Sequence, residues 1–528
     1  MEANFSSFEI PQNMEPFHWA TFRAPKPLNN FQIFVVLAFL LLLYLTARAV
    51  YLLFYHPLSR FQGPKLWILT RWPFMRAMQS GTLVHQVQKF HSKYGEMIRI
   101  GPNEISCINP QAWTDIYGSH KPGQNFGKNP LWMSRKQNST NSILSAGDKD
   151  HHRIRRLISH AFSDKALREQ EPILQQYVGT LMRRLHEQAR AGWGDAIVDL
   201  VEWFSWTTFD IVGELGFGET FGCLTDERHH SWSALVFSHF KAASLVTSVR
   251  FYPFLERFLR WWLPSPVSNR QGHFQLSREK IHRRLKGAKA SPDFISYVLD
   301  PKNEERMSLQ EIETTFNILI IAGSETTASA LAGTTGYLLK NPMCLATLVQ
   351  EIRCNFEEET DINLSSLGKL PYLSAVIEEG LRMAPPVPSG LPRVTPAEGG
   401  IVCGEWLPGG TNISFSQWSA YRSPVNFSQP NEFIPERWLQ SNRTSQFATD
   451  KKNTLQPFSF GPRNCIGKNL AYAELRLILS RMIWNFDLSL PKGMADYDWA
   501  KQKTYVLVEK EPLKVRLSPR KFVQLGST

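Results

Sequence analysis

Residues 458–467 read FSFGPRNCIG. Its single cysteine, Cys465, stands two residues after Arg463 and shortly before a helical pattern at 470–486. Gly461 permits a tight turn, and glycines let a backbone approach a flat ligand closely. A cysteine just ahead of a helix lies where the helix dipole favours an anion. These features suit a thiolate ligand, which needs a lowered pKa, but for a lone cysteine a buried structural role in a turn is the ordinary expectation.

The composition is that of a folded protein, with 528 residues, 43% of them hydrophobic and 20% charged. The six cysteines are scattered without a CxxC pair, which argues against a zinc site and against a secreted disulfide framework. The formal net charge is +12, but no basic stripe with interleaved aromatic residues indicates nucleic-acid binding. A basic surface facing an anionic membrane or an acidic protein partner explains the charge better.

Residues 31–55 read FQIFVVLAFLLLLYLTARAVYLLFY. A helix of this length spans about 37 Å, enough to cross the hydrocarbon core of a membrane. The segment preceding it, residues 1–30, is too long and too polar for a signal peptide or for part of a buried core helix. More basic residues follow the apolar run than precede it, which predicts a cytosolic main domain and a luminal tail over 1–30.

Residues 56–70 contain two prolines and a glycine, and we interpret them as a proline-rich hinge. Long amphipathic patterns dominate residues 71–528, with short strand-like pieces such as 96–109 and 409–421. The pattern predicts one large domain that is mainly α-helical with small β-sheets.

A long helical pattern covers 309–341 and contains AGSETT at 322–327. Gly323 is expected to weaken the helix, and the Thr326 hydroxyl can bond a backbone carbonyl. The alternative is a buried helix whose small residues merely permit close packing. A second pattern, EEGLR, places Glu379 and Arg382 on one helical face, where such a pair is usually a weak surface contact.

The cysteine stretch matches F-x-x-G-x-R-x-C-x-G at Phe458, Gly461, Arg463, Cys465 and Gly467. This pattern resembles the haem-binding loop of cytochromes P450. AGSETT and EEGLR stand in the order found in that family, and so does FIPERW, which contains Arg437. The resemblance extends over nearly the whole chain and implies the cytochrome P450 fold, preceded here by one transmembrane helix.

The resemblance implies that 71–528 is a haem-thiolate domain in which Cys465 ligates the iron of haem b, iron protoporphyrin IX. The other cofactor-binding residues that it implies are Arg463, Arg155, Arg393, His151, Phe458, Gly461 and Gly467. His151 stands where the family commonly has tryptophan, and Arg155 follows four residues later.

The remaining roles implied by the resemblance concern the interior of the domain. Thr326 would hold water and stabilise the bound oxygen, and Glu325 would relay protons. Glu379, Arg382 and Arg437 would form a buried structural network. Ala322 and Val387 are weaker candidates for the substrate pocket.

These features together imply a monooxygenase with O₂ as cosubstrate. Electrons would come from NADPH through a separate NADPH–cytochrome P450 reductase, with cytochrome b5 as a second donor. The segments 56–67 and 207–224 are most similar to fungal microsomal members. That similarity implies a single-pass protein of the endoplasmic reticulum membrane that hydroxylates or epoxidises a lipophilic secondary metabolite (a polyketide, terpenoid or alkaloid).

Two other functions remain open at this point. One is a haem-thiolate isomerase or dehydratase that needs no external electrons, and the other is a non-catalytic membrane protein that binds haem. The intact acid–threonine pair at Glu325 and Thr326 and the intact cysteine loop favour the monooxygenase.

Overall fold

The computed structural model describes residues 29–121, 123–132, 140–227, 231–262, 268–287, 293–299, 306–439 and 446–521. The chain divides into two compact units, Met1–Tyr55 and His56–Thr528.

The described part of the first unit is one helix. It consists of α1 (Asn30–Val50) and a π-helical turn (Tyr51–Tyr55), and Asn29 caps its start by accepting a hydrogen bond from the backbone of Gln32 at 2.8 Å. No residue of α1 is buried, and the span is long and apolar enough to cross a membrane. The helix predicted at 31–55 is therefore present, whereas the expected luminal tail lies outside the described residues except for its last two positions.

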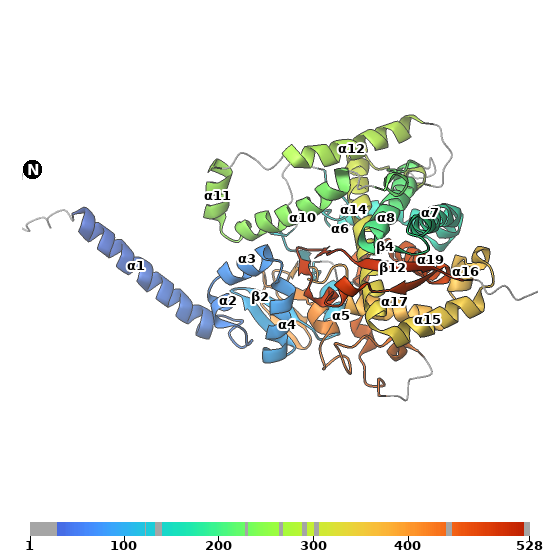
Figure 1. The fold of residues 1–528 in the computed structure, drawn as a ribbon. Coiled ribbons are helices and arrows are strands. Elements are labelled where there is room, and N and C mark those ends of the chain that lie inside the picture. Colours follow the sequence, from blue (N-terminus) through green and yellow to red (C-terminus); the bar gives the residue numbers. More distant parts are fainter. Residues whose placement is uncertain are drawn as a thin grey trace, which may run out of the picture. The chain divides into compact units, whose positions relative to one another are not determined.

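The second unit is mainly helical, as predicted (Figure 1). Its α-helices are α2 (Lys65–Leu69), α3 (Trp72–Gln79), α4 (Leu83–Tyr94), α5 (Ala112–Tyr117), α6 (Asp148–Ser159), α7 (Asp164–Ala191), α8 (Leu200–Phe217), α9 (Cys223–Asp226), α10 (Ser231–Arg250), α11 (Pro253–Trp262), α12 (Ser268–Lys286), α13 (Phe294–Val298), α14 (Leu309–Lys340), α15 (Pro342–Asn355), α16 (Leu364–Leu367), α17 (Pro371–Met383), α18 (Gln417–Tyr421) and α19 (Lys468–Asn485).

Among the described residues of this unit, the strands form four small sheets. The largest has the order β1 (Met97–Gly101), β2 (Glu104–Cys107), β8 (Asn412–Phe415), β5 (Arg393–Val394) and β3 (Gly127–Lys128). The others are β4 (Ala196–Asp199) with β12 (Lys514–Pro519) and β9 (Phe486–Ser489), β6 (Gly400–Val402) with β7 (Glu405–Leu407), and β10 (Lys503–Thr504) with β11 (Val508–Glu509). The pattern at 96–109 forms two strands as predicted, but only the first half of 409–421 is strand, because α18 follows at once.

The long helix α14 packs beside α8 in the interior of the second unit (Figure 1). A Cβ atom on Gly323 would lie 2.8 Å from Cγ2 of Val212, so the glycine lets the two helices approach closely. The Thr208 hydroxyl of α8 also donates to the Ser324 carbonyl of α14 at 3.0 Å. Since α14 runs without a break, Gly323 permits close packing here, and the expected weakening of the helix is not seen.

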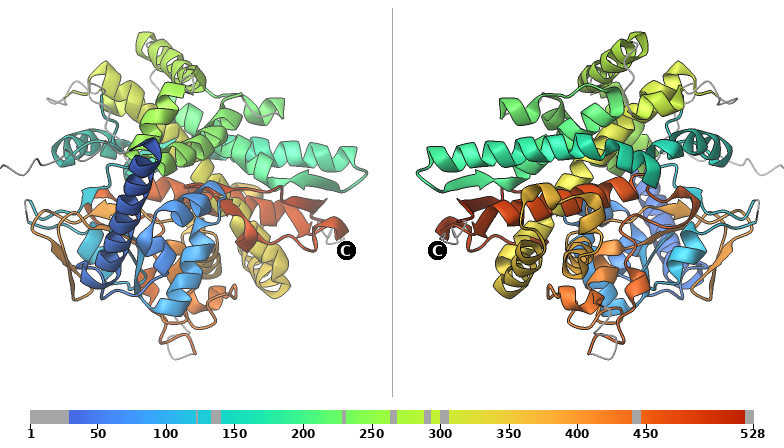
Figure 2. Two further views of the ribbon diagram at one scale, coloured as in Figure 1. Left: turned by 90° about the vertical axis from the view of Figure 1, so that its left-hand side faces the viewer. Right: turned by 90° about the vertical axis from the view of Figure 1, so that its right-hand side faces the viewer.

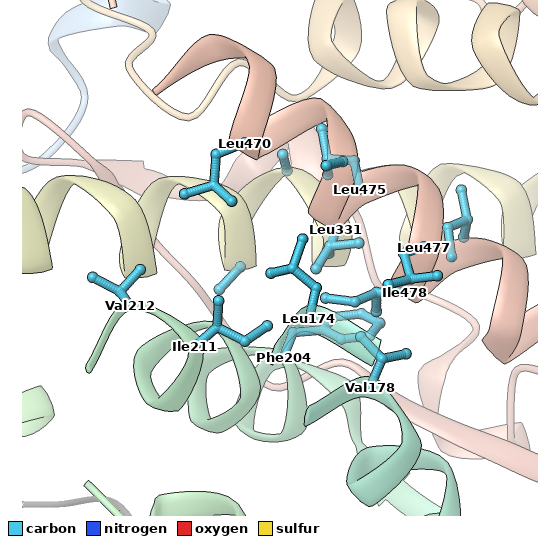
Figure 3. Packing of buried hydrophobic residues seen from close by; sticks show 14 of the residues in the cluster. Leu174, Val178, Phe204, Ile211, Val212, Leu331, Leu470, Leu475, Leu477 and Ile478 are labelled. Atoms are coloured by element: carbon cyan, nitrogen blue, oxygen red, sulfur yellow. The ribbon is translucent and has the colours of Figure 1, made fainter. Parts of the chain in front are cut away.

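The helix that follows the cysteine stretch lies in the same core. In both views of Figure 2, α19 runs beside α7. Figure 3 shows apolar side chains meeting at this junction, from α7 (Leu174, Val178), α8 (Phe204, Ile211, Val212), α14 (Leu331) and α19 (Leu470, Leu475, Leu477, Ile478). Burial of these side chains fixes α19, and with it the loop directly before it, against α14.

Residues 56–70, predicted as a hinge, belong to the second unit. Leu58 is fully buried, and Phe61 and Trp67 are nearly so. The backbone N–H of Arg99 in β1 donates to the Gln62 carbonyl at 2.8 Å. Apolar burial and this hydrogen bond hold the segment against the first strand.

The structure brings together the three residues expected in a buried network. Glu379 and Arg382 lie one turn apart on α17, and all three side chains are completely buried. Arg382 donates from Nε and Nη2 to the two carboxylate oxygens of Glu379, each at 2.8 Å. Arg437 donates from Nε to the same carboxylate at 3.2 Å.

Further partners complete this network. The indole N–H of Trp438 and the backbone N–H of Ile434 donate to Glu379 at 2.9 and 2.8 Å. Arg437 also forms a buried ion pair with Asp450, which the motifs had not indicated. Burial raises the pKa of Glu379, but the guanidinium of Arg382 and that of Arg437 outweigh it, and the pKa lies below its usual value.

We expect Glu379→Gln to lower the free energy of unfolding by about 3–5 kcal/mol, because two guanidinium groups would lose a buried partner. The loss should be fully present above the pKa of an unfolded glutamate and should shrink as the pH falls from there toward the lowered pKa of folded Glu379, because the unfolded chain takes up its proton first. Denaturant unfolding of the solubilised protein measures both effects. Glu169→Gln removes an exposed i,i+4 pair with Lys165 and should cost less than about 1 kcal/mol. An equal loss of unfolding free energy in Glu379→Gln and Glu169→Gln would contradict the structural role of Glu379.

A second buried acid, Glu474, lies on α19 and is 2% exposed. Its side chain interacts with that of Thr327 on α14, and no described residue bonds its Oε1 atom. Burial raises the pKa of Glu474 to about 8, so the carboxyl is mainly neutral at pH 7.

This raised pKa predicts a pH-dependent stability. Between the usual glutamate pKa of 4.5 and about 8, the folded protein keeps a proton that the unfolded chain releases. Glu474 should therefore lower stability by about 1.4 kcal/mol per pH unit as the pH rises through this window. Glu474→Gln mimics the neutral acid and should flatten the stability profile measured by denaturant unfolding. Exposed Glu398→Gln is the control, and an unchanged slope in both variants would refute the assignment.

Candidate functional site

The cysteine loop is a tight turn that ends at the start of α19. A short 3-10 turn covers Gly461–Arg463, and the backbone N–H of Cys465 donates to the Phe458 carbonyl at 2.8 Å. Gly461 has φ +74°, and a Cβ atom there would lie 2.0 Å from the Tyr117 carbonyl oxygen. Only glycine fits this position without strain. The helix begins at Lys468, two residues earlier than its pattern indicated, so Cys465 lies directly ahead of its first turn.

Cys465 lies deep among protein atoms, yet its own surface is exposed. The side chain of Cys465 therefore keeps accessible surface although protein atoms surround it. Burial raises the pKa of the thiol, and the Gly467 backbone N–H, Arg155 and Lys468 oppose this only in part. The expected lowering of the pKa is not found in the protein alone, so a bound metal ion would have to supply the remaining stabilisation of a thiolate.

Phe458 and Gly467 shape the two sides of the loop. The ring of Phe458 lies 5.1 Å from that of Tyr472 on α19 and packs against the main core. A Cβ atom on Gly467 would lie 4.0 Å from the Cys465 sulfur. Phe458 thus supports the loop from the core side, while Gly467 keeps space free beside the sulfur.

Arg155 of α6 reaches the cysteine loop. Its Nη1 and Nη2 atoms donate to the carbonyl and the side-chain oxygen of Asn464, each at 2.6 Å. Both terminal nitrogens are thus engaged by Asn464, although the motif implied that Arg155 contacts a cofactor carboxylate. Here the guanidinium holds Asn464, the residue before Cys465, and places a positive charge near the sulfur.

Arg463 faces the start of α6. Its guanidinium donates to Asp148 Oδ1 at 2.6 and 3.1 Å and to the Ala146 carbonyl at 3.0 Å. The Nη1 atom is buried, and no described residue accepts a hydrogen bond from it. A buried donor without an acceptor is costly, so this atom marks a place that suits an anionic ligand.

Two more basic side chains lie in this region. Arg393 of β5 is 7% exposed, and the described residues offer its guanidinium no acceptor, only the Tyr117 ring with its centroid 5.4 Å away. Burial and the charge of Arg463 lower the pKa of Arg393. His151 of α6 is buried too, and burial together with Arg463 and Lys128 lowers its pKa to about 3, so its ring is neutral.

Positive charge is in excess around the cysteine loop. Arg463, Lys128 and Arg155 act on His151, and Arg463 acts on Arg393. The anion that acts on both is Asp148, which is exposed. A ligand that carries carboxylates would balance this excess. No described group of three or more His, Cys, Asp and Glu side chains could hold a metal ion, so a metal on Cys465 must bring its other ligands with it. The residues present therefore fit haem, with its four ring nitrogens and two propionates.

Thr326 and Ala322 lie one turn apart in the middle of α14. The Thr326 hydroxyl donates to the Ala322 carbonyl at 2.6 Å, as its position in the helix predicted. Ala322 is exposed and Thr326 half-buried on a helix whose other residues are mostly buried, so this turn too borders open space. The Thr326 oxygen keeps its lone pairs and can accept a hydrogen bond from water.

Glu325 is held by an unexpected partner. The Lys510 ammonium donates to Glu325 Oε2 at 2.5 Å, and both side chains are nearly buried. Val387, the other candidate for the substrate pocket, is half-buried between α17 and β5. The motifs missed Asn464, Asp148 and Lys510, because no spacing rule connects residues that meet only in the folded chain.

Comparison with known proteins identifies the family. A family model described as Cytochrome P450 matches residues 62–517. The cytochrome P450 monooxygenase astJ of Aspergillus oryzae is 45% identical over 479 residues, 90% of this chain and 95% of the relative. The cytochrome P450 monooxygenase atr2 of Stereocaulon alpinum is 44% identical over 93% of this chain and 97% of the relative. Averantin hydroxylase of Dothistroma septosporum is 40% identical over 92% of this chain and 91% of the relative.

These matches agree with the resemblance inferred from the motifs and confirm the predicted fold class. Proteins of this kind use haem and O₂ with an electron donor, and they act on lipophilic substrates. The chain is an oxidoreductase of the monooxygenase kind, and it belongs to the cytochrome P450 family.

Proposed function

We propose that this protein binds haem b through Cys465 and hydroxylates or epoxidises a lipophilic fungal secondary metabolite (a polyketide, terpenoid or alkaloid). The observation that carries the proposal is the exposed Cys465 sulfur inside the fold, next to an excess of buried positive charge. Electrons come from NADPH through a separate NADPH–cytochrome P450 reductase, with cytochrome b5 as a second donor. The relatives' printed names, monooxygenase and hydroxylase, support the reaction type.

Haem held by a thiolate supplies the activation of O₂ and the transfer of one oxygen atom to the substrate. The Cys465 thiolate would hold the iron. Arg463, Arg393 and neutral His151 would bind the propionates, and Arg155 acts through Asn464 by fixing the loop. Phe458, Gly461 and Gly467 keep the loop in shape.

Thr326 and Glu325 manage protons in this proposal. The Thr326 hydroxyl, fixed by the Ala322 carbonyl, accepts a hydrogen bond from a water molecule beside the site. Glu325 passes protons inward from the side of Lys510. Ala322 and Val387 border the substrate. Positioned proton transfer of this kind contributes roughly 10²–10⁴-fold to a rate.

The apolar helix Asn30–Tyr55 supports a single-pass anchor in the endoplasmic reticulum membrane. Lysine and arginine are more frequent after the helix than before it, which favours a cytosolic catalytic domain and a luminal tail. The cytosolic side is where the reductase and NADPH are available.

The first test is the carbon monoxide difference spectrum of the reduced protein in membranes. We expect a strongly red-shifted Soret band for the wild type and its loss in Cys465→Ser, because the shift requires a thiolate ligand. Cys354→Ser removes another exposed cysteine and should leave the band unchanged. A folded wild-type protein that binds haem without the shifted band would refute thiolate ligation and the proposed monooxygenase.

A second test addresses Thr326. Replacing it with valine keeps the shape of the side chain but removes the hydroxyl, so more of the NADPH consumed should appear as hydrogen peroxide, with at least about a tenfold loss of productive turnover. Thr326→Ser keeps the hydroxyl and should stay close to wild type. NADPH oxidation and peroxide release with the reductase measure the effect. Equal peroxide yields in the two variants would show that the hydroxyl takes no part.

A further inference from the structure

The ion pair between Lys510 and Glu325 joins the C-terminal part of the chain to the middle of α14. Nζ and Oε2 lie 2.5 Å apart, and the two side chains are 6% and 10% exposed. Contacts of this kind between exposed side chains contribute little, whereas a nearly buried carboxylate depends on its partner to remain charged. Lys510 is thus the cation beside the acid that follows Ser324 in the AGSETT turn.

The backbone on both sides of Lys510 is fixed. Lys510 directly follows β11, which pairs with β10 in a hairpin. The next backbone N–H, of Glu511, donates to the side chain of Gln502 at 2.7 Å, and the N–H of Leu513 donates to Asp199 at 3.0 Å. The ammonium group is therefore attached to a backbone position whose neighbours are hydrogen-bonded, and its stem is nearly buried.

The same hairpin is attached to α10. The buried hydroxyl of Ser244 donates to the Tyr505 carbonyl at 2.6 Å, and Lys241 forms an ion pair with Glu509 at 3.3 Å. Lys510 follows Glu509 directly. The position of its ammonium group is consequently set by two helices, α10 through the hairpin and α14 through Glu325.

We propose that Lys510 is a positioning residue for the reaction: its ammonium group fixes the Glu325 carboxylate and supplies its counter-charge between proton transfers. The inference rests on the proposed function, in which Glu325 relays protons. A relay group must take up and release a proton repeatedly, which works best when neither form is strongly favoured. Removing Lys510 would leave burial unopposed by a cation and would shift the balance of the nearly buried carboxyl toward its protonated form. Proton delivery beside Thr326 would then slow.

The test compares Lys510→Met with Lys510→Arg in the full-length protein in membranes. In Lys510→Met, infrared spectroscopy should detect a new carbonyl stretch of a protonated carboxyl at neutral pH, which disappears in Lys510→Met/Glu325→Gln. With the reductase, NADPH oxidation should fall at least about tenfold and show a larger solvent deuterium isotope effect. Lys510→Arg keeps the positive charge and should show neither change.

Two further variants separate this role from a purely structural one. Lys510→Gln keeps a polar contact without the charge, so it replaces the methionine variant if that fails to fold, with the same expected results. Lys501→Met removes a lysine that is 80% exposed and pairs with Asp498 at 3.6 Å, and it should behave as wild type. The reduced carbon monoxide spectrum of every variant verifies that haem is bound.

The outcomes distinguish the inference from the function on which it rests. Normal wild-type turnover, with no new carboxyl band and an unchanged isotope effect in Lys510→Met, would overturn the role of Lys510 alone. A wild type that binds haem but oxidises no NADPH with the reductase would overturn the proposed function, and the role of Lys510 with it. The carboxyl band together with the larger isotope effect would establish the role.

Discussion

The Cys465 thiol has to remain accessible inside a domain whose core side chains are buried. Much of the structure around Cys465 satisfies this constraint. The loop can hold its shape only because Gly461 adopts a positive φ close to the Tyr117 carbonyl and because Arg155 donates two hydrogen bonds to Asn464. The loop is in turn placed by α19, whose apolar side chains pack against α7, α8 and α14. Tight packing around the loop thus holds the Cys465 side chain where its surface stays accessible.

The same constraint explains where charge is buried. Glu379 is surrounded by donors, so its cost of burial is offset within the protein. Arg463 and Arg393 differ, because the described residues leave an Nη1 atom of the first and the guanidinium of the second without an acceptor. Such donors cost the fold stability unless a ligand accepts their hydrogen bonds. The balanced network stabilises the protein, whereas the unbalanced one suits a ligand that brings negative charge.

Sequence patterns predicted the parts of the site that short spacing determines. The cysteine loop, the i,i+3 pair Glu379 and Arg382 and the bond from Thr326 back along its own helix all depend on local geometry. The patterns missed contacts between distant residues, such as Arg155 with Asn464, 309 residues away along the chain. The sequence pattern around Cys465 likewise indicated a lowered pKa of its thiol. The pattern shows the charges near the thiol but not its depth of burial, and the effect of burial on the pKa is the larger one.

Two acids lie at the AGSETT turn, Glu325 within it and Glu474 against Thr327, and their surroundings differ. Glu474 approaches Thr327 from α19 through an apolar core without a cation, and its carboxyl is neutral at pH 7. Glu325, two positions before Thr327, meets the Lys510 ammonium on the hairpin side. A neutral buried acid holds its proton, so Glu474 can stabilise the contact between α14 and α19 but is a poor relay. The acid on α19 thus makes a static contact near Thr327, whereas the acid of α14 itself is paired with a cation from the segment after β11.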